Sequence, residues 1–158
     1  MRELDTVQNV DVARYMGTWY EIARLPQSFE KGLVGVTATY ELLPSGKLRV
    51  LNKGHDNDLG GRVRAVEGRA KVVDLQTNAK LKVTFFWPFY GDYWVLELGK
   101  DYEYAAVGEP SRRYLWVLSR TPHMDETVYQ GIMRRMEEKG FDISRIERVP
   151  QRSDAERS

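Results

Sequence analysis

The sequence predicts an all-β fold: an eight-stranded antiparallel up-and-down β-barrel with one C-terminal α-helix packed on the outside. About eight segments alternate between apolar and polar residues, as strands with one dry face do. Short turns join these segments, and no helical segment separates one from the next. Because open sheet edges invite aggregation, we expect so many strands to close into a barrel.

The size and charge of the chain narrow the class of protein. Its 158 residues are expected to form one domain: a polar segment at 1–8, a barrel domain at 9–150 and a polar tail at 151–158. The 24 basic and 23 acidic residues leave a net charge of +1, which offers no argument for nucleic-acid binding. The absence of Cys excludes disulfides, thiolate metal sites and a Cys nucleophile.

The sequence is compatible with two cellular locations. No apolar run is long enough to cross a bilayer, and residues 1–5 lack the apolar region of a signal peptide. Two interpretations therefore remain: a cytoplasmic protein, or a mature form whose leader has been removed.

The first predicted strand, residues 17–25, organises the barrel. Thr18 and Trp19 favour an extended, half-buried segment, Gly17 permits a bend at its start, and Pro26 ends its pairing. Since both of its faces carry apolar bulk, we expect the strand to be covered on both sides. Strict alternation assigns Trp19, Glu21, Ala23 and Leu25 to one face, and Tyr20, Ile22 and Arg24 to the other.

Seven further strands and a helix follow in order. The helix is predicted over about residues 125–139, with Asp125 as N-cap and Gly140 at the C-cap. Val128, Ile132 and Met136 form an apolar stripe at helical spacing, which we expect to cover the doubly apolar strands at 17–25, 93–98 and 114–119. The predicted strands are 34–42, 47–54, 66–72, 80–85, 93–98, 104–107 and 114–119.

Small side chains at inward positions predict a cavity, because an eight-stranded barrel lined in this way has room for a ligand. Glu21 and Glu97 share the same inward parity. Paired carboxylates can mark a glycosidase, but we favour a tie between each of them and a polar partner near the floor. The small inward residues are Ala23, Ala38, Gly54, Gly68, Ala70 and Ala105.

Three separated motifs carry a resemblance to a known family. The chain contains Gly17-x-Trp19 at the start of the first strand, Asp101-Tyr102 at a later turn, and YLWVLSRTP before the helix. Together they resemble the lipocalin family, although Lys100 stands where the middle motif usually has Thr. The runs GTWYEIARLP, NKGH, FFWPFYG and YLWVLSRTP are most similar to the bacterial outer-membrane, apolipoprotein D-like lipocalins.

This resemblance implies roles for several residues. Gly17, Trp19 and Arg120 would close the barrel floor, with Arg120 over the face of Trp19 in a scaffold contact worth roughly 1–2 kcal/mol. Trp116 and Tyr90 would lie at or near the ligand. A removed leader would place the protein in the periplasm or at the outer membrane; without one it would be cytoplasmic.

Alternation supplies the rest of the expected cavity lining, which is mostly apolar with a few polar groups. Such a lining suits an acyl chain, since each buried methylene contributes about 0.8 kcal/mol. With Tyr90 added from the resemblance, the predicted ligand-binding residues are Ala38, Tyr40, Val50, Asn52, Val66, Val83, Phe85, Tyr90, Tyr93, Val95, Tyr114 and Trp116.

The function we predict is non-enzymatic binding, storage or transport of fatty acids or lysophospholipids, in the service of membrane maintenance. The alternative is a carrier of a tetrapyrrole (a bilin or haem) or other pigment, stacked on Tyr40, Tyr93, Tyr114 and Trp116. As further partners we consider a second copy of the chain, in a homodimer, and a membrane surface, to which the protein would bind peripherally.

We expect no catalytic residue, no metal site and no cofactor. The sequence has no evident Ser–His–carboxylate set. His55 and His123 fall in predicted loops without a ligand partner at metal spacing, which favours ordinary surface residues.

Overall fold

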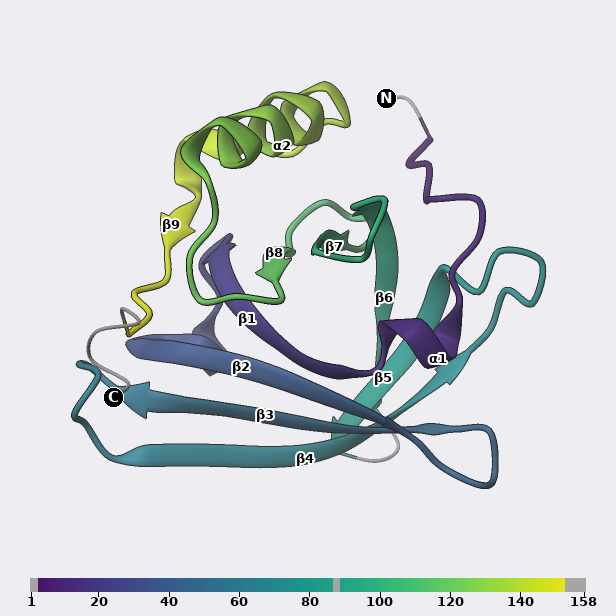
Figure 1. Ribbon diagram of the computed structural model, residues 1–158, viewed down its shortest axis with the longest axis horizontal. Coiled ribbons are helices and arrows are strands. Elements are labelled where there is room, and N and C mark those ends of the chain that lie inside the picture. Colours follow the sequence, from purple (N-terminus) through teal and green to yellow (C-terminus); the bar gives the residue numbers. More distant parts are fainter. Residues whose placement is uncertain (1–2, 87–88, 153–158) are drawn as a thin grey trace.

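The computed structural model describes residues 3–86 and 89–152, so the predicted tail beyond residue 152 lies outside the described residues. Strands dominate the chain, and a single long helix follows them (Figure 1). In chain order the elements are α1 (Val12–Tyr15), β1 (Gly17–Arg24), the 3-10 turn η1 (Ser28–Glu30), β2 (Leu33–Leu42), β3 (Leu48–Asp56), β4 (Val63–Val72), β5 (Lys80–Phe86), β6 (Phe89–Leu98), β7 (Tyr104–Gly108), β8 (Leu115–Ser119), α2 (Glu126–Glu138), the 3-10 turn η2 (Ile143–Arg145) and β9 (Glu147–Arg148).

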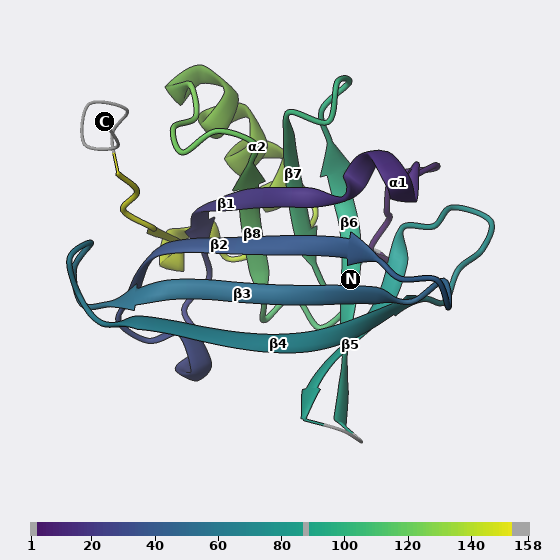
Figure 2. The ribbon, with the colours of Figure 1, turned by 60° about the horizontal axis from the view of Figure 1, so that its bottom comes forward.

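The strands form a closed antiparallel barrel. Each strand from β2 to β7 pairs with the next in sequence, β8 pairs with β1, and β1 pairs with β2, which closes the ring of eight. Figure 2 shows β1 to β4 side by side in this order. The short β9 adds to the outer side of β1, where Ala23 lies opposite Arg148. The predicted eight-stranded up-and-down barrel with one C-terminal helix is therefore confirmed.

Helix α2 covers one side of the barrel, as its apolar stripe predicts (Figure 1). Ile132 and Met136 are fully buried and belong to a core cluster with Leu115 and Val117 of β8 and with Leu96 of β6. A second cluster occupies the barrel interior. Two separate cores thus lie on the two faces of the same strands.

Local capping explains where α2 begins and ends. The Asp125 carboxylate accepts hydrogen bonds from the backbone N–H groups of Thr127 at 2.9 Å and Val128 at 3.3 Å. At the other end, Gly140 adopts φ +97°, a conformation that other residues rarely take. In the described part of the chain, no helix has the length and hydrophobicity needed to span a membrane.

Two β-bulges overturn part of the predicted inward and outward assignment. The β1–β8 register shifts between Glu21 and Ala23, and the β6–β7 register shifts between Val95 and Glu97. A bulge adds one residue to a strand and so reverses the parity beyond it. Ala23, which we expected to face inward, instead packs in the core beneath α2. Glu97 likewise leaves the interior.

Candidate functional site

The barrel floor is built around Trp19, which is 0% exposed. Its indole N–H donates to the carbonyl of Tyr15 in α1 at 2.9 Å, so α1 is held across the end of the barrel. The Arg120 guanidinium lies 3.8 Å from the centroid of the Trp19 ring. It also donates to the carbonyls of Thr18 at 3.1 Å and Arg14 at 2.9 Å. Arg120 is thus where the resemblance puts it, and it joins three segments at the floor.

Gly17 is the third floor residue of the motif. Both its backbone conformation and the space around it favour glycine at this position. It adopts φ +101°, and an added Cβ would approach the Arg120 guanidinium to 3.3 Å. A larger residue would therefore be strained and would crowd the contact between Arg120 and Trp19.

Three tyrosine hydroxyls meet just above the floor. The Tyr93 hydroxyl lies 2.6 Å from that of Tyr15 and 2.9 Å from that of Tyr40. Burial is the first cause that raises the pKa of each of these phenols above its ordinary value, so all three stay neutral at physiological pH. Tyr15 was missing from the predicted lining because it belongs to α1, where strand alternation gives no information.

The interior wall becomes more accessible from the floor towards the mouth. Tyr40, Val50 and Val95 are buried within the interior core cluster. Nearer the mouth, Ala38, Val83, Phe85 and Trp116 pack against that cluster and are still partly exposed, as is Tyr93 above the floor. Asn52 is partly exposed too and lies between Ala38 and Val66 in the register. Side chains that face inward yet remain accessible indicate unfilled space at this level.

Gly91 of β6 supports the same conclusion. It lies opposite the inward-facing Val83 of β5 and has the same parity as Tyr93 and Val95. A Cβ added to Gly91 would meet no described atom within 4 Å. The wall at this position therefore borders open space.

A row of three aromatic rings leads from the interior to the rim. Tyr114 stacks on Trp116, with the ring centroids 6.0 Å apart and the planes inclined by 10°. Phe29 of η1 lies 6.1 Å from Tyr114 and is 63% exposed. These rings extend the apolar wall to the loop between β1 and β2.

Two predicted lining residues lie further out than expected. Val66 is 40% exposed, because the β4–β5 ladder ends at Arg69 and leaves this part of β4 paired on one side only. Tyr90 is 43% exposed, with the Lys71 ammonium 5.0 Å from its ring centroid. The structure therefore brings the other predicted residues together around the interior but places these two at its edge.

A buried charged cluster, which the sequence did not predict, surrounds Arg24 near the mouth. Arg24 lies opposite Trp116 in the register, and its guanidinium reaches Glu30 of η1 at 3.3 Å and Glu147 of β9 at 2.8 Å. It also donates to the carbonyl of Leu33 at 2.8 Å. Arg24 thereby ties both ends of the β1–β2 loop to the barrel.

Glu21 lies inside the barrel, as its parity predicts, and its ion-pair partner is Arg24, near the mouth, instead of a group at the floor. It is 2% exposed, its Oε2 is 4.0 Å from the Arg24 guanidinium, and its Oε1 has no hydrogen-bond partner among the described residues. Burial first, and then the charge of Glu30, raise the pKa of Glu21 well above its ordinary value. Both influences favour the neutral form of this carboxyl group.

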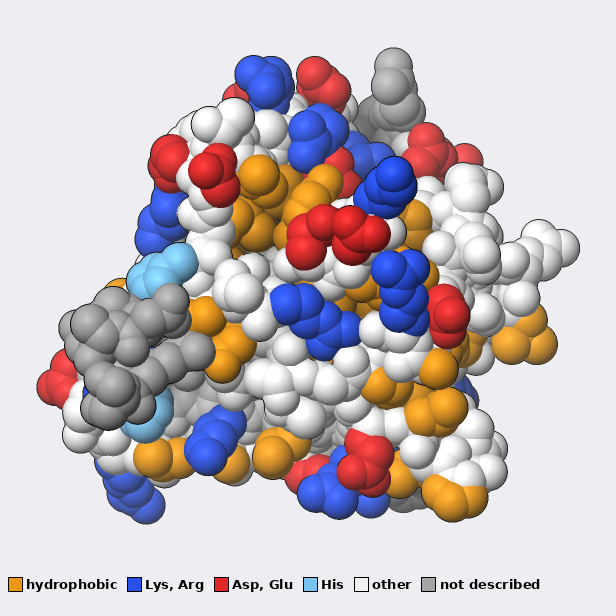
Figure 3. Space-filling view, in the orientation of Figure 1, with side chains coloured by type: hydrophobic (Ala, Val, Ile, Leu, Met, Phe, Trp, Pro, Cys, Tyr) orange, Lys and Arg blue, Asp and Glu red, His pale blue; other side chains and the backbone are white. Residues whose placement is uncertain are grey.

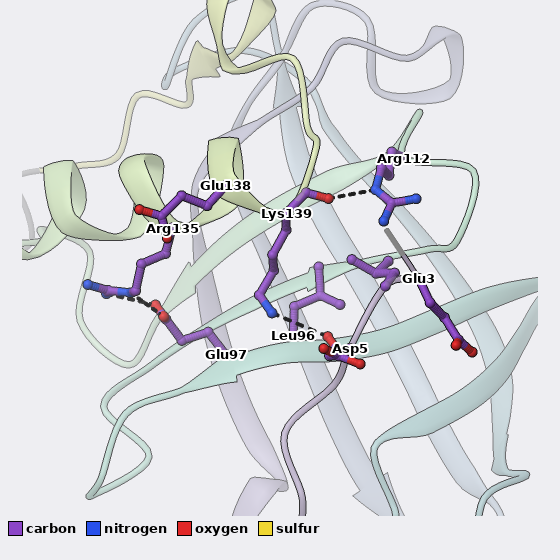
Figure 4. Close-up of a pocket in the computed structure, with 9 residues that line it drawn as sticks. Glu3, Asp5, Leu96, Glu97, Arg112, Arg135, Glu138 and Lys139 are labelled. Carbon is purple, nitrogen blue, oxygen red and sulfur yellow. Dashed lines mark hydrogen bonds and ion pairs between the residues drawn. The ribbon is translucent and has the colours of Figure 1, made fainter. Parts of the chain in front are cut away.

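Glu97 lies outside the barrel and binds Arg135 of α2 through two contacts, with Nη2 2.9 Å from Oε2. The pair borders a hollow of about 290 Å³ between β6, the end of α2 and the N-terminal segment (Figure 4). In Figure 4, Arg135 and Lys139 extend from the helix towards Glu97 and Asp5. Side chains of both signs line this hollow, and it is separate from the barrel interior.

Other chemistries find little support in the described residues. No group of three or more His, Asp or Glu side chains there is arranged to hold a metal ion. Glu21 and Glu97 lie on opposite faces of the barrel wall, so they do not form the paired carboxylates of a glycosidase. On the face shown in Figure 3, acidic and basic side chains are interspersed.

Comparison with known proteins agrees with this geometry. A family described as a lipocalin-like domain matches residues 10–151. The chain is 47% identical over 145 residues to outer membrane lipoprotein Blc of Escherichia coli K12, covering 92% of this chain and 81% of that protein. It is 36% identical over 148 residues to apolipoprotein D of Rattus norvegicus, covering 88% and 76%.

Solved structures show the same fold. Insecticyanin from the tobacco hornworm Manduca sexta superposes with a TM-score of 0.77 at 21% identity, covering 98% of this chain and 87% of that one. At this level of identity the likeness concerns the fold alone.

Proposed function

Because the chain belongs to the lipocalin family, we propose that its barrel binds an acyl lipid, such as a fatty acid or lysophospholipid, without catalysing a reaction. The observation that carries this proposal is the set of inward-facing side chains above the floor, Ala38 and Trp116 among them, that remain partly exposed. An apolar tube closed at one end suits a chain that enters by its tail. About ten buried methylenes would supply roughly 8 kcal/mol, from which the cost of association is subtracted.

The surroundings of the mouth support a ligand delivered from a lipid surface. Phe29 is exposed at the rim, and the chain's relative Blc is named an outer membrane lipoprotein. We therefore propose that this protein also works at or near the outer membrane.

A fluorescent fatty-acid probe tests the proposal, with delipidated protein and displacement by unlabelled lipid. Binding at micromolar concentration with quenching of tryptophan fluorescence is expected, and no binding at that concentration would defeat the proposal. Native mass spectrometry of co-purified ligand would identify the lipid class. A visible absorption band from a bound pigment would instead favour the tetrapyrrole alternative.

A substitution at Gly91 tests whether the ligand lies in the barrel. Gly91→Phe should project a ring into the space beside Val83 and weaken probe binding at least tenfold, and its Cβ meets no described atom within 4 Å. Leu75→Phe is the matched control, because Leu75 is exposed in the turn between β4 and β5. Equal affinity of the two variants would place the ligand elsewhere.

A further inference from the structure

The three tyrosine hydroxyls above the floor hold one hydrogen more than they can use among themselves. Tyr93 lies between Tyr15 and Tyr40, so the trio forms two hydrogen bonds, at 2.6 and 2.9 Å. Each hydroxyl carries one hydrogen. Whichever way the two bonds point, one of the three hydrogens has no acceptor within the trio. No other described group accepts a hydrogen bond from these hydroxyls.

Ionisation does not remove the excess hydrogen. Burial is the largest influence on each phenol, and it raises the pKa of Tyr15, Tyr40 and Tyr93. All three hydrogens are therefore present at any pH at which the protein is expected to work. A buried donor without an acceptor costs free energy of desolvation. A ligand oxygen that accepted this hydrogen would remove that cost and so gain binding free energy.

Exposure indicates which hydroxyl offers the hydrogen. Tyr15 and Tyr40 are buried residues, whereas Tyr93 taken as a whole residue is partly exposed and packs against the interior cluster. If Tyr15 and Tyr40 both donate to Tyr93, its oxygen uses both lone pairs and its own hydrogen is left free. This arrangement uses both lone pairs of the central oxygen, and the free hydrogen then belongs to the most accessible residue of the three.

We propose that Tyr15, Tyr40 and Tyr93 form a hydrogen-bond donor subsite near the closed end of the barrel, which recognises a neutral oxygen on the leading end of the ligand. This inference rests on the proposed function and narrows it: the preferred ligands would carry a hydroxyl, keto or ester oxygen at the end that enters first. One neutral donor is a poor match for a carboxylate, whose desolvation needs several charge-assisted bonds. A plain alkyl end would leave the donor unpaired.

The test compares dodecanoic acid with 12-hydroxydodecanoic acid, which differ only by an oxygen at the far end. Both are measured on the wild-type protein and on a variant with Tyr15→Phe, Tyr40→Phe and Tyr93→Phe combined. The combined variant is the appropriate one, because removal of one hydroxyl still leaves at least one free hydrogen. It also keeps the shape of the rings, so it should fold.

The wild-type protein should favour the hydroxylated acid, relative to the parent acid, about five- to tenfold more than the triple variant does. An equal ratio in the two proteins would overturn the proposal and would mean that a water molecule satisfies the free hydrogen. Failure of either acid to bind the wild-type protein would instead count against the proposed function itself.

A second measurement covers the case in which the triple variant does not fold. Slowly exchanging tyrosine hydroxyl protons can be followed by nuclear magnetic resonance in the wild-type protein. The Tyr93 hydroxyl resonance should shift with 12-hydroxydodecanoic acid and move much less with dodecanoic acid. Identical shifts with the two acids would also refute the subsite.

Discussion

Replacement of Arg120 by Met is expected to destabilise the protein by about 3 kcal/mol without removing ligand binding. The guanidinium makes a cation–π contact with Trp19 at 3.8 Å, worth about 1 kcal/mol at this partly exposed position. Its two hydrogen bonds, to the carbonyls of Thr18 and Arg14, each contribute about 1 kcal/mol net. Because Met keeps an apolar side chain over the indole, the loss of unfolding free energy reports the cation–π contact and the two hydrogen bonds, and not a loss of packing.

Urea unfolding followed by tryptophan fluorescence measures this change, and thermal melting gives a second readout. For a domain of this size, about 3 kcal/mol corresponds to a fall in Tm of roughly 6–12 °C. Arg120→Lys should lose about half as much, because an ammonium keeps the charge but cannot stack flat and donate to both carbonyls.

Arg134→Met provides the control, since Arg134 is exposed on α2 and makes no hydrogen bond or ion pair with a described residue. It should change stability by no more than about 0.5 kcal/mol. The reasoning is refuted if Arg120→Met costs no more than this control. A large loss of probe affinity in a folded Arg120→Met variant would contradict the assignment of Arg120 to the scaffold.

Three further substitutions test other parts of the structure. Ile132→Ala removes a fully buried side chain between α2 and the barrel, and should cost about 2–5 kcal/mol in urea unfolding. Asp125→Ala removes the N-cap of α2 and should cost about 1 kcal/mol in the same assay. Glu21→Gln should become more stabilising relative to wild type as pH rises from 5 to 8. The pKa of Glu21 is raised in the fold, so its favourable contribution is full below the ordinary value of 4.5 and is lost as pH rises through the folded pKa; a stability difference that does not change with pH would contradict this.

The features that could be predicted from sequence are those set by local pattern. The position of α2 follows from its 3.6-residue apolar period and from Asp125 and Gly140 at its ends. The Trp19 and Arg120 contact follows from the family motifs, which specify a residue pair far apart in the chain. Neither depends on the exact pairing of neighbouring strands.

The side chains that were misplaced depend on strand pairing. Ala23 and Glu97 follow bulges, and nothing in the local composition marks the extra residue that reverses the parity. Arg24 was assigned to the outer face for the same reason, although the structure places it opposite Trp116. Tyr15 was missed because α1 crosses the end of the barrel, and only the closed fold brings its hydroxyl to Tyr93.

The different environments of Glu21 and Glu97 explain how the interior remains suited to an apolar guest. The second bulge moves Glu97 to the outer surface, where its carboxylate contacts the Arg135 guanidinium. Glu21 stays inside, but its raised pKa favours the neutral form, as burial also does for the tyrosine hydroxyls below it. Polar atoms of the lower interior can therefore orient a ligand by hydrogen bonds without an uncompensated charge, which an acyl chain could not solvate. A ligand that brought a charge to this depth would lose more by desolvation than these neutral groups could return.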